Sequence, residues 1–140
     1  MMCSALSRTE FRQTRDIPRE CILALYQAVG WSCAKKPDAL CSGLRNSDSL
    51  VSAWDGDTLV GLGNAISDGA LVVYYPHLLV LPEYQRRGIG KRILQILTGM
   101  YANFHQQILL AEGPVAFYEK CGFVRAVTTV PMWIMPSDAG

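Results

Sequence analysis

The chain has 140 residues, half of them hydrophobic, which suffices for one domain with a buried core, so we expect a single domain over residues 1–140. Thirteen Lys and Arg against twelve Asp and Glu leave a formal charge of +1, and this balance does not favour nucleic acid as a partner. No stretch approaches the ~20 apolar residues of a membrane span, and Met1–Arg15 lacks the apolar core of a signal peptide.

The five cysteines are scattered, odd in number and without a Cys-x-x-Cys pair, and only two histidines accompany them. These residues are Cys3, Cys21, Cys33, Cys41 and Cys121, with His77 and His105. Such a set predicts neither a disulfide framework nor a structural metal site. We expect free thiols, no metal and a reducing cytoplasmic setting without membrane contact.

The N-terminal third predicts an exposed edge strand and two helices. Charged residues alternate through residues 7–14, the expected strand. Asp16 as a cap and Pro18 in the first turn predict a helix that ends at Gly30. Its apolar positions follow helical spacing and are Ile22, Leu25, Tyr26 and Val29. A second, shorter helix is expected over residues 37–45.

The middle of the chain predicts an antiparallel meander. Its strands are expected at residues 50–54, 59–66 and 71–81, separated by the turns Asp55-Gly56-Asp57 and Ser67-Asp68-Gly69. Pro76 falls inside the last of these strands and has no N–H to donate to a sheet. A bulge or interrupted pairing is therefore expected at that position.

Residues 78–97 predict a strand, a short basic loop and a helix that continues to about His105. The start of a helix carries unpaired N–H groups and the positive end of the peptide dipoles. Gly88 and Gly90 let a ligand approach the backbone there, and the nearby cations are Arg86, Arg87, Lys91 and Arg92. The loop suits a phosphate or pyrophosphate, with a plain turn as the alternative.

The C-terminal part predicts a short buried strand over residues 107–110 and a helix from Gly113-Pro114 to Lys120. Gly122 is expected to end this helix, and residues 123–135 to supply one or two final strands. Residues 136–140 read as a loose tail.

Two motifs together resemble one family. Gln85-x-x-Gly88-x-Gly90, after a strand and Pro82, is similar to the pyrophosphate-binding motif of the GNAT superfamily of acyl-CoA-dependent N-acetyltransferases. Phe117-Tyr118-Glu119-Lys120-Cys121-Gly122-Phe123 is similar to the F-Y-x-x-x-G-F signature that closes the same fold. The whole chain resembles small single-domain bacterial-type members. This likeness implies an α/β fold with a mixed, mostly antiparallel sheet of six or seven strands, splayed at its centre, and about four helices.

The resemblance implies direct transfer of an acetyl group from the co-substrate acetyl-CoA to a primary amine of a small molecule. At the splay, backbone groups near Leu79 and Val80 would bind the pantetheine arm and the acyl carbonyl. The pyrophosphate contacts would come from the loop and helix start, namely Gln85, Arg86, Arg87, Gly88, Ile89, Gly90 and Lys91. Residues 37–45 would cover the acceptor pocket. A homodimer is also compatible with the family.

Acetyl transfer needs a neutral amine and a proton for the departing thiolate. Tyr118 matches the family position that donates this proton, and packing against Phe117 is its structural alternative. His77 is a candidate general base, with a structural role equally open. The other candidates for handling the amine proton are Tyr74, Glu83, Glu112 and a chain of water molecules.

One position departs from the family pattern, and two alternative functions follow. Ala111 stands where many members carry an Asn that contacts the CoA arm. A non-catalytic acyl-CoA-binding or sensor module would keep the phosphate loop without amine chemistry. A simple phosphate- or nucleotide-binding domain would bind ATP rather than CoA. An acceptor pocket lined by Trp31, Tyr75, Met132, Trp133 and Met135 is a further expectation, with ordinary core packing as the alternative.

Overall fold

The computed structural model describes residues 8–136. Its contacts divide the chain into two compact units, Met1–Leu109 and Leu110–Gly140. The first unit contains the sheet, and the second contains one short helix within its described residues. A single domain over residues 1–140 stays a prediction.

The first unit is built on a mixed sheet of six strands in the order β1-β2-β3-β4-β6, with β5 also paired to β3. The strands are β1 (Glu10–Arg12), β2 (Ser49–Asp55), β3 (Thr58–Ser67), β4 (Val72–Tyr74), β5 (Leu78–Val80) and β6 (Gln106–Ile108). Of the strand pairs within the described residues, β4 and β6 run parallel and the others are antiparallel. The expected meander and the mixed, mostly antiparallel α/β class are confirmed.

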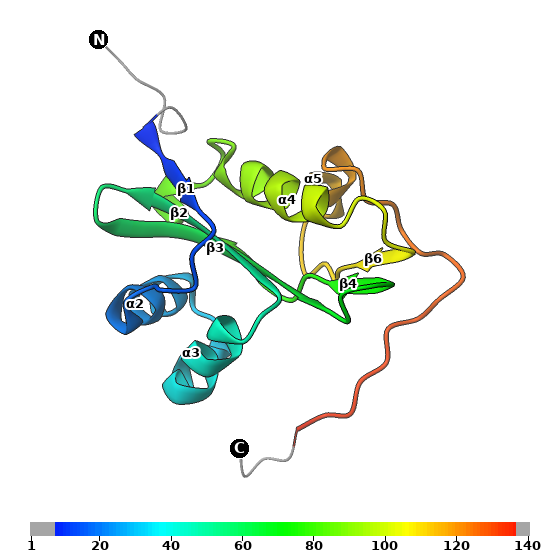
Figure 1. Ribbon diagram of the computed structural model, residues 1–140, viewed down its shortest axis with the longest axis horizontal. Helices are drawn as coiled ribbons and strands as arrows, with labels where there is room; N and C mark the ends of the chain where they lie inside the picture. Colours follow the sequence, from blue (N-terminus) through cyan, green and yellow to red (C-terminus); the bar gives the residue numbers. More distant parts are fainter. Residues whose placement is uncertain (1–7, 137–140) are drawn as a thin grey trace. The chain divides into compact units, whose positions relative to one another are not determined.

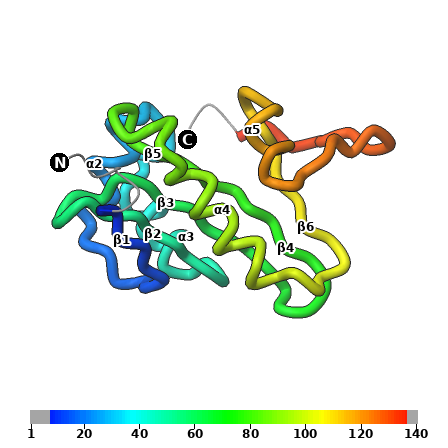
Figure 2. The backbone as a smooth tube through the Cα atoms, turned by 90° about the horizontal axis from the view of Figure 1, so that it is seen from above, coloured from blue at the N-terminus to red at the C-terminus, as the bar shows by residue number. Residues whose placement is uncertain are grey.

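Three α-helices cover the two faces of this sheet. They are α2 (Arg19–Val29), α3 (Pro37–Arg45) and α4 (Ile89–Met100), and the 3₁₀ turns η1 (Ser32–Lys35) and η2 (Pro82–Tyr84) join them to the rest. Helix α4 lies on one face, whereas α2 and α3 lie on the other (Figure 1). Figure 2 shows the same unit from above, with α4 running along the sheet. No helix among residues 8–136 is long and apolar enough to cross a bilayer.

Alternation along β3 divides the core between these two faces. Leu62 is fully buried in a cluster with Leu25 and Tyr26 of α2. Gly61 and Gly63 point the opposite way, towards Ile93 of α4. Burying a large apolar side chain contributes about 1.5–3 kcal/mol, so both helices are held mainly by these packed faces.

Two predicted helix ends are wrong in detail. Helix α2 has Pro18 as its N-cap residue and no side-chain cap, so Asp16, two positions earlier, is not the cap, and its N–H donates to Thr14 Oγ1 at 3.0 Å. Helix α4 ends at Met100 rather than near His105. Tyr101 leaves helical geometry at φ −122°, where its buried hydroxyl donates to Asp48 Oδ2 at 2.5 Å. A tertiary hydrogen bond thus overrides the continuing apolar spacing.

The edges of the predicted strands also differ. Strand β1 covers residues 10–12 of the expected 7–14, and Ser7 lies outside the described residues. Strand β6 is displaced to residues 106–108, and Gln106 and Ile108 are exposed instead of buried. Among residues 8–136, β6 pairs with β4 on one edge, and its other edge pairs with no described strand.

In the second unit, α5 (Val115–Lys120) forms as predicted and is followed by Gly122 at φ +99°. The final strands expected over residues 123–135 are absent from the described part of this unit. Val124 is 87% exposed and Ile134 is 97% exposed. None of these residues pairs with a strand in the described structure, so the local pattern alone does not form a sheet. Residues 137–140 of the expected tail lie outside the described residues.

Candidate active site

Strand β3 pairs with two different strands, β4 before Pro76 and β5 after it. Strand β3 pairs with β5 through Gly61–Gly63 and with β4 through Ile66 and Ser67. Between them, Asn64 N–H donates to the His77 carbonyl at 3.2 Å, while His77 N–H donates to the Asn64 side-chain oxygen at 3.0 Å. The expected break at Pro76 is confirmed, and a buried asparagine side chain holds it.

The register shows which backbone groups face the resulting gap. Leu81 N–H donates to the Val60 carbonyl and Asn64 N–H to that of His77. Hydrogen-bonded pairs alternate along an antiparallel ladder, so the N–H and C=O of Leu79 also point to β3. Those of Leu78 and Val80 point to the other edge of β5, which pairs with no strand in the described residues.

The loop after β5 is shaped around two residues with positive φ. Arg86 has φ +64° and Gly88 has φ +85°, and Gly88 is the N-cap of α4. No side chain of the described residues caps this helix start, so the first N–H groups of α4, beginning at Ile89, lack that partner. Left-handed backbone followed by an uncapped helix start forms a concave row of donors suited to phosphate oxygens.

Side chains fix this loop to the sheet. Gln85 Nε2 donates to the Val80 carbonyl at 3.0 Å. The Tyr84 hydroxyl donates to Asp55 Oδ2 at 2.5 Å, at the β2–β3 turn. That hydrogen bond is the main reason why the pKa of Tyr84 is raised. The Arg87 guanidinium lies 5.1 Å from the centre of the Tyr84 ring. The loop is therefore tied at both its strand side and its hairpin side.

On the opposite face of the sheet, α3 and the strand break enclose a hollow of about 280 Å³, which we call the α3 hollow. Leu40 and Leu44 of α3, together with Ile66 and Pro76, supply apolar walls. Asn64 and His77 contribute the polar groups at the break. The hollow therefore reaches the same strand interruption that leaves the β5 backbone open.

His77 lies in an aromatic cluster beside this hollow. Its Nδ1 is 2.7 Å from the Tyr26 hydroxyl, and the Trp31 ring meets the imidazole edge to face with centroids 5.0 Å apart. Burial lowers the pKa of His77 and raises that of Tyr26, so both are neutral at pH 7. Tyr26 is fully buried, and His77 is the partner found for its hydroxyl.

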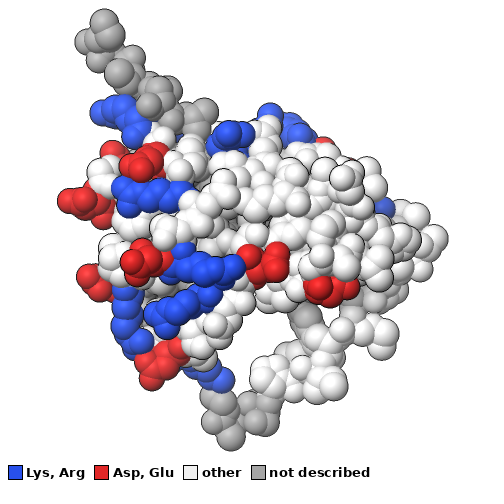
Figure 3. Space-filling view, in the orientation of Figure 1, with Lys and Arg blue, Asp and Glu red and all other residues white. Residues whose placement is uncertain are grey.

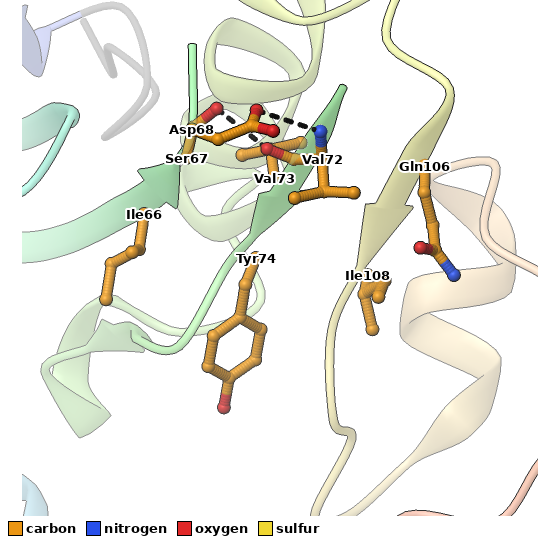
Figure 4. A pocket seen from close by; sticks show the side chains of 8 residues that line it. All are labelled: Ile66, Ser67, Asp68, Val72, Val73, Tyr74, Gln106 and Ile108. Carbon is orange, nitrogen blue, oxygen red and sulfur yellow. Dashed lines mark hydrogen bonds between the residues drawn. The ribbon is translucent and has the colours of Figure 1, made fainter. Parts of the chain in front are cut away.

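A second hollow, of about 320 Å³, lies over β3, β4 and β6 (Figure 4). Its carboxylate belongs to Asp68, whose Oδ1 accepts from the backbone N–H groups of Ala70, Leu71 and Val72 at 2.8–3.1 Å. Those bonds, first the one from Leu71, lower the pKa of Asp68. Asp68 is thus engaged in the turn, and the rest of the hollow is a largely apolar sheet surface that includes Tyr74, 36% exposed.

Tyr118 belongs to the second unit, as do Ala111 and Glu112. Its ring meets that of Phe117 edge to face, and its carbonyl accepts from Phe123 N–H at 3.1 Å. Burial is the main cause that raises the pKa of Tyr118, so the phenol keeps its proton at neutral pH. The structure brings Leu79, Val80, His77 and the loop together in the first unit, whereas the part of Tyr118 in the site stays a prediction.

A family model described as the acetyltransferase (GNAT) domain matches residues 46–125, more than half of the chain. The chain belongs to the GNAT acetyltransferase family. A GNAT family acetyltransferase from Streptococcus pneumoniae is 33% identical with a TM-score of 0.81, covering 92% of this chain and 99% of that one. The family assignment confirms the resemblance in the two sequence motifs.

Two further proteins are similar to part or all of this GNAT chain. It is 41% identical over 69 residues to GCN5-related N-acetyltransferase 3, chloroplastic, of Arabidopsis thaliana, a match that covers 46% of this chain. The match spans only 29% of that relative's length. An aminoglycoside acetyltransferase from a soil metagenomic sample, solved with sisomicin, has a TM-score of 0.71 at 17% identity, covering 94% of this chain and 98% of that one. At that identity the likeness shows the fold alone.

Several residues of this GNAT site were not found by sequence reasoning. Asn64 is a polar residue inside a strand whose other residues are almost all apolar or glycine. A polar residue in such a run needs a hydrogen-bond partner when it is buried, and this was the signal in the sequence that could have identified Asn64. The contact between Tyr84 and Asp55 joins positions 29 apart, and that between Tyr26 and His77 joins positions 51 apart. Such pairs have no local sequence signature.

Proposed function

We propose that the protein is an N-acetyltransferase that moves an acetyl group from acetyl-CoA directly to a primary amine of a small molecule. The observation that carries the proposal is the strand break at Pro76, which leaves the Leu78 peptide groups and the Val80 N–H without a strand partner, close in the chain to a basic loop and the uncapped start of α4. A thioester-linked acyl group and a pyrophosphate are the two parts of one ligand that such a pair of features suits.

The residues present fit acetyl-CoA. Its pyrophosphate would lie at the start of α4, held by backbone donors and by the cations of the loop, and Gly88 keeps that approach open. These contacts are assigned to Gln85, Arg86, Arg87, Gly88, Ile89, Gly90 and Lys91. Gln85 contributes indirectly, because its amide holds the Val80 carbonyl. When bound, acetyl-CoA supplies the activated acetyl group.

The register refines the backbone assignment at the splay. Of the two residues first assigned, Leu79 directs its peptide groups to β3, whereas the Val80 N–H faces the open edge. We therefore assign polarisation of the acyl carbonyl to Val80 N–H, with the Leu78 peptide groups on the same edge for the pantetheine arm. Leu79 contributes by packing, since its side chain is buried. A fixed N–H aimed at a developing oxyanion stabilises the transition state without reorganisation.

The amine would reach the break through the α3 hollow and must lose a proton during transfer. His77 accepts that proton at Nε2 only in the tautomer whose Nδ1–H donates to Tyr26. In the other tautomer the Tyr26 hydroxyl donates to Nδ1, and Nε2–H is a donor that orients the amine. Since Tyr26 is fully buried and its hydrogen needs an acceptor, the second tautomer costs less. Water would then carry the proton away.

Tyr118 is assigned the proton that the departing thiolate takes up, because it holds its position in the closing motif and its phenol is protonated at neutral pH. Direct transfer is proposed in preference to a covalent acyl-enzyme. Cys33, the thiol that lines the α3 hollow, has a pKa raised by burial and so little thiolate at neutral pH.

The proposal places the protein in the cytoplasm, as suits the free thiols of Cys21, Cys33 and Cys41. Within residues 8–136, no group of three His, Cys, Asp or Glu residues is placed to hold a metal ion. Figure 3 shows positive and negative side chains interspersed on the face in view, which suits a small-molecule substrate better than a nucleic acid. A homodimer is compatible with the proposal and is not needed for it.

Calorimetric titration with acetyl-CoA, followed by thiol release over an amine panel, tests the function. Gly88→Val should abolish measurable binding, because a β-branched residue does not tolerate φ +85° at the phosphate approach. Gly99→Val is the matched control, since a Cβ at Gly99 meets nothing within 4 Å. Tight binding without thiol release would favour the sensor module, and binding of ATP without CoA the nucleotide domain.

A further inference from the structure

Resting on the proposed function, we infer the chemical class of the acceptor: a primary amine on a compact apolar body, whose further polar group, when it has one, is anionic. A polycationic acceptor is excluded. The inference comes from what lines the α3 hollow and from where the nearby carboxylates are engaged.

Among the residues that the structure describes, none that lines the α3 hollow carries a carboxylate. Leu40, Leu44, Ile66 and Pro76 present hydrocarbon, and Lys36 is the lysine among the lining residues. Lys36 is exposed and precedes α3 as its N-cap residue, so its ammonium lies at the rim and not in the interior. An apolar body is favoured inside, and a negative group is favoured at the rim.

Three acidic residues that lie within a few positions of the lining residues in sequence already have partners. Asp38 on α3 pairs with Arg19 Nη2 at 2.8 Å. Asp48 Oδ2 accepts from the Tyr101 hydroxyl at 2.5 Å, and Asp68 is satisfied by backbone N–H groups of its own turn. A second ammonium on the acceptor would either lose its hydration against the apolar walls or lie at the rim beside the like charge of Lys36, and the lining residues offer it no carboxylate in either place.

Size points the same way. The hollow of about 280 Å³ lies just below the ~300–1,000 Å³ of typical drug-sized sites. A phenyl ring or a short alkyl body fits within it next to His77. Asn64 and His77 lie at the break, so the reacting amine is the polar end that enters and the apolar body lies along α3.

The experiment uses three amines with the same body. They are phenethylamine, 4-(2-aminoethyl)benzoate, which adds a carboxylate, and 4-(aminomethyl)phenethylamine, which adds a second ammonium. Thiol release at saturating acetyl-CoA should give kcat/KM values for the first two at least about tenfold above the third, because the second ammonium has no carboxylate partner among the lining residues. Spermidine should fall with the dicationic compound.

Lys36→Glu and Lys35→Glu form a matched pair, because both make the same change of charge and only Lys36 lines the hollow. Lys36→Glu should lower kcat/KM for the benzoate by about three- to tenfold and raise it for the dication, with phenethylamine within twofold. Lys35→Glu should leave the order of the three amines unchanged. An equal response to both variants would assign the effect to general surface charge and overturn the role of Lys36.

Failure of the inference and failure of the proposed function are distinguishable. Fastest turnover with spermidine or the dication would overturn the acceptor class while leaving N-acetyl transfer intact. Absence of turnover with every amine would count against the proposed function instead. In that case saturation-transfer NMR of the three amines with the protein still decides the class. Binding of the benzoate and phenethylamine above the dication supports it, and the reverse order or equal binding overturns it.

Discussion

Two glycines of β3 let α4 lie close against the sheet, and Gly63→Ala tests whether this closeness positions the phosphate loop. A Cβ at Gly63 would lie 2.7 Å from Ile93 Cγ2 and 3.1 Å from Leu97 Cδ1. Both side chains are fully buried, so neither moves aside into solvent. The new methyl therefore pushes α4 away from the sheet at its middle.

The magnitude follows from the distance. Ordinary contact begins near 3.4 Å, so Ile93 must give by about 0.7 Å from its 2.7 Å position. Overpacking of this kind costs about 1–3 kcal/mol, partly offset by the ~0.4–1 kcal/mol that Ala gains over Gly through the unfolded chain. We expect Gly63→Ala to lower the free energy of unfolding by about 1–2 kcal/mol. Because the loop begins α4, the affinity for acetyl-CoA should fall as well.

Urea denaturation and calorimetric titration of acetyl-CoA measure the two effects. Gly99→Ala is the control on the same helix, since a Cβ there meets nothing within 4 Å, and it should stabilise by about 0.5–1 kcal/mol. In an Ile93→Ala background the clash is removed, so Gly63→Ala should cost at least about 1 kcal/mol less than in the native chain. The same cost in both backgrounds would refute the reasoning.

Three further predictions concern single side chains. Tyr84→Phe removes the bond to Asp55 and should weaken acetyl-CoA binding by about two- to fivefold at little cost in stability; an unchanged dissociation constant would show that the loop holds itself. Burial lowers the pKa of His77 from 6.5, so the unfolded chain binds more protons just below pH 6.5. The free energy of unfolding should therefore fall as pH drops through that range, and less so in His77→Gln; equal slopes in urea titrations would contradict this. Tyr118→Phe should lower kcat at least about tenfold with acetyl-CoA affinity retained, and full turnover would remove Tyr118 from the mechanism.

The sequence predicted those parts of the site that depend on neighbouring residues. The turn at Asp55-Gly56-Asp57, the loop around Gly88 and the break at Pro76 each follow from the backbone preference of one or two residue types. Proline has no N–H and glycine tolerates positive φ wherever they stand, so the consequences are local and readable. The helix expected over residues 37–45 is confirmed, and Pro37 stands at its first position.

What the sequence did not predict depends on distant contacts. Helix α4 stops at Tyr101 because that hydroxyl reaches Asp48 and Ser49, more than fifty positions earlier. The strands expected over residues 123–135 do not form, because a strand depends on hydrogen bonds to another segment and alternation within the segment does not supply them. The assignment of Leu79 and Val80 was made as a pair, and only the register with β3 separates the one that faces the gap from the one that does not.

Asn64 links the fold to the proposed chemistry. Pro76 interrupts the ladder between β3 and its neighbour, and such a break leaves buried polar groups at risk of losing partners. The Asn64 side chain supplies a partner for the His77 N–H, which donates to its Oδ1, and its own Nδ2 donates to Ser47 Oγ at 2.9 Å. Ser47 in turn donates to the Gly43 carbonyl on α3, at 2.9 Å. One chain of hydrogen bonds thus fixes the strand break, the His77 backbone and the helix that walls the acceptor hollow. A site that holds an amine beside an open strand edge requires the strand break, the His77 backbone and α3 to keep a constant spacing. The buried Asn64 amide can connect all three because it both donates and accepts hydrogen bonds.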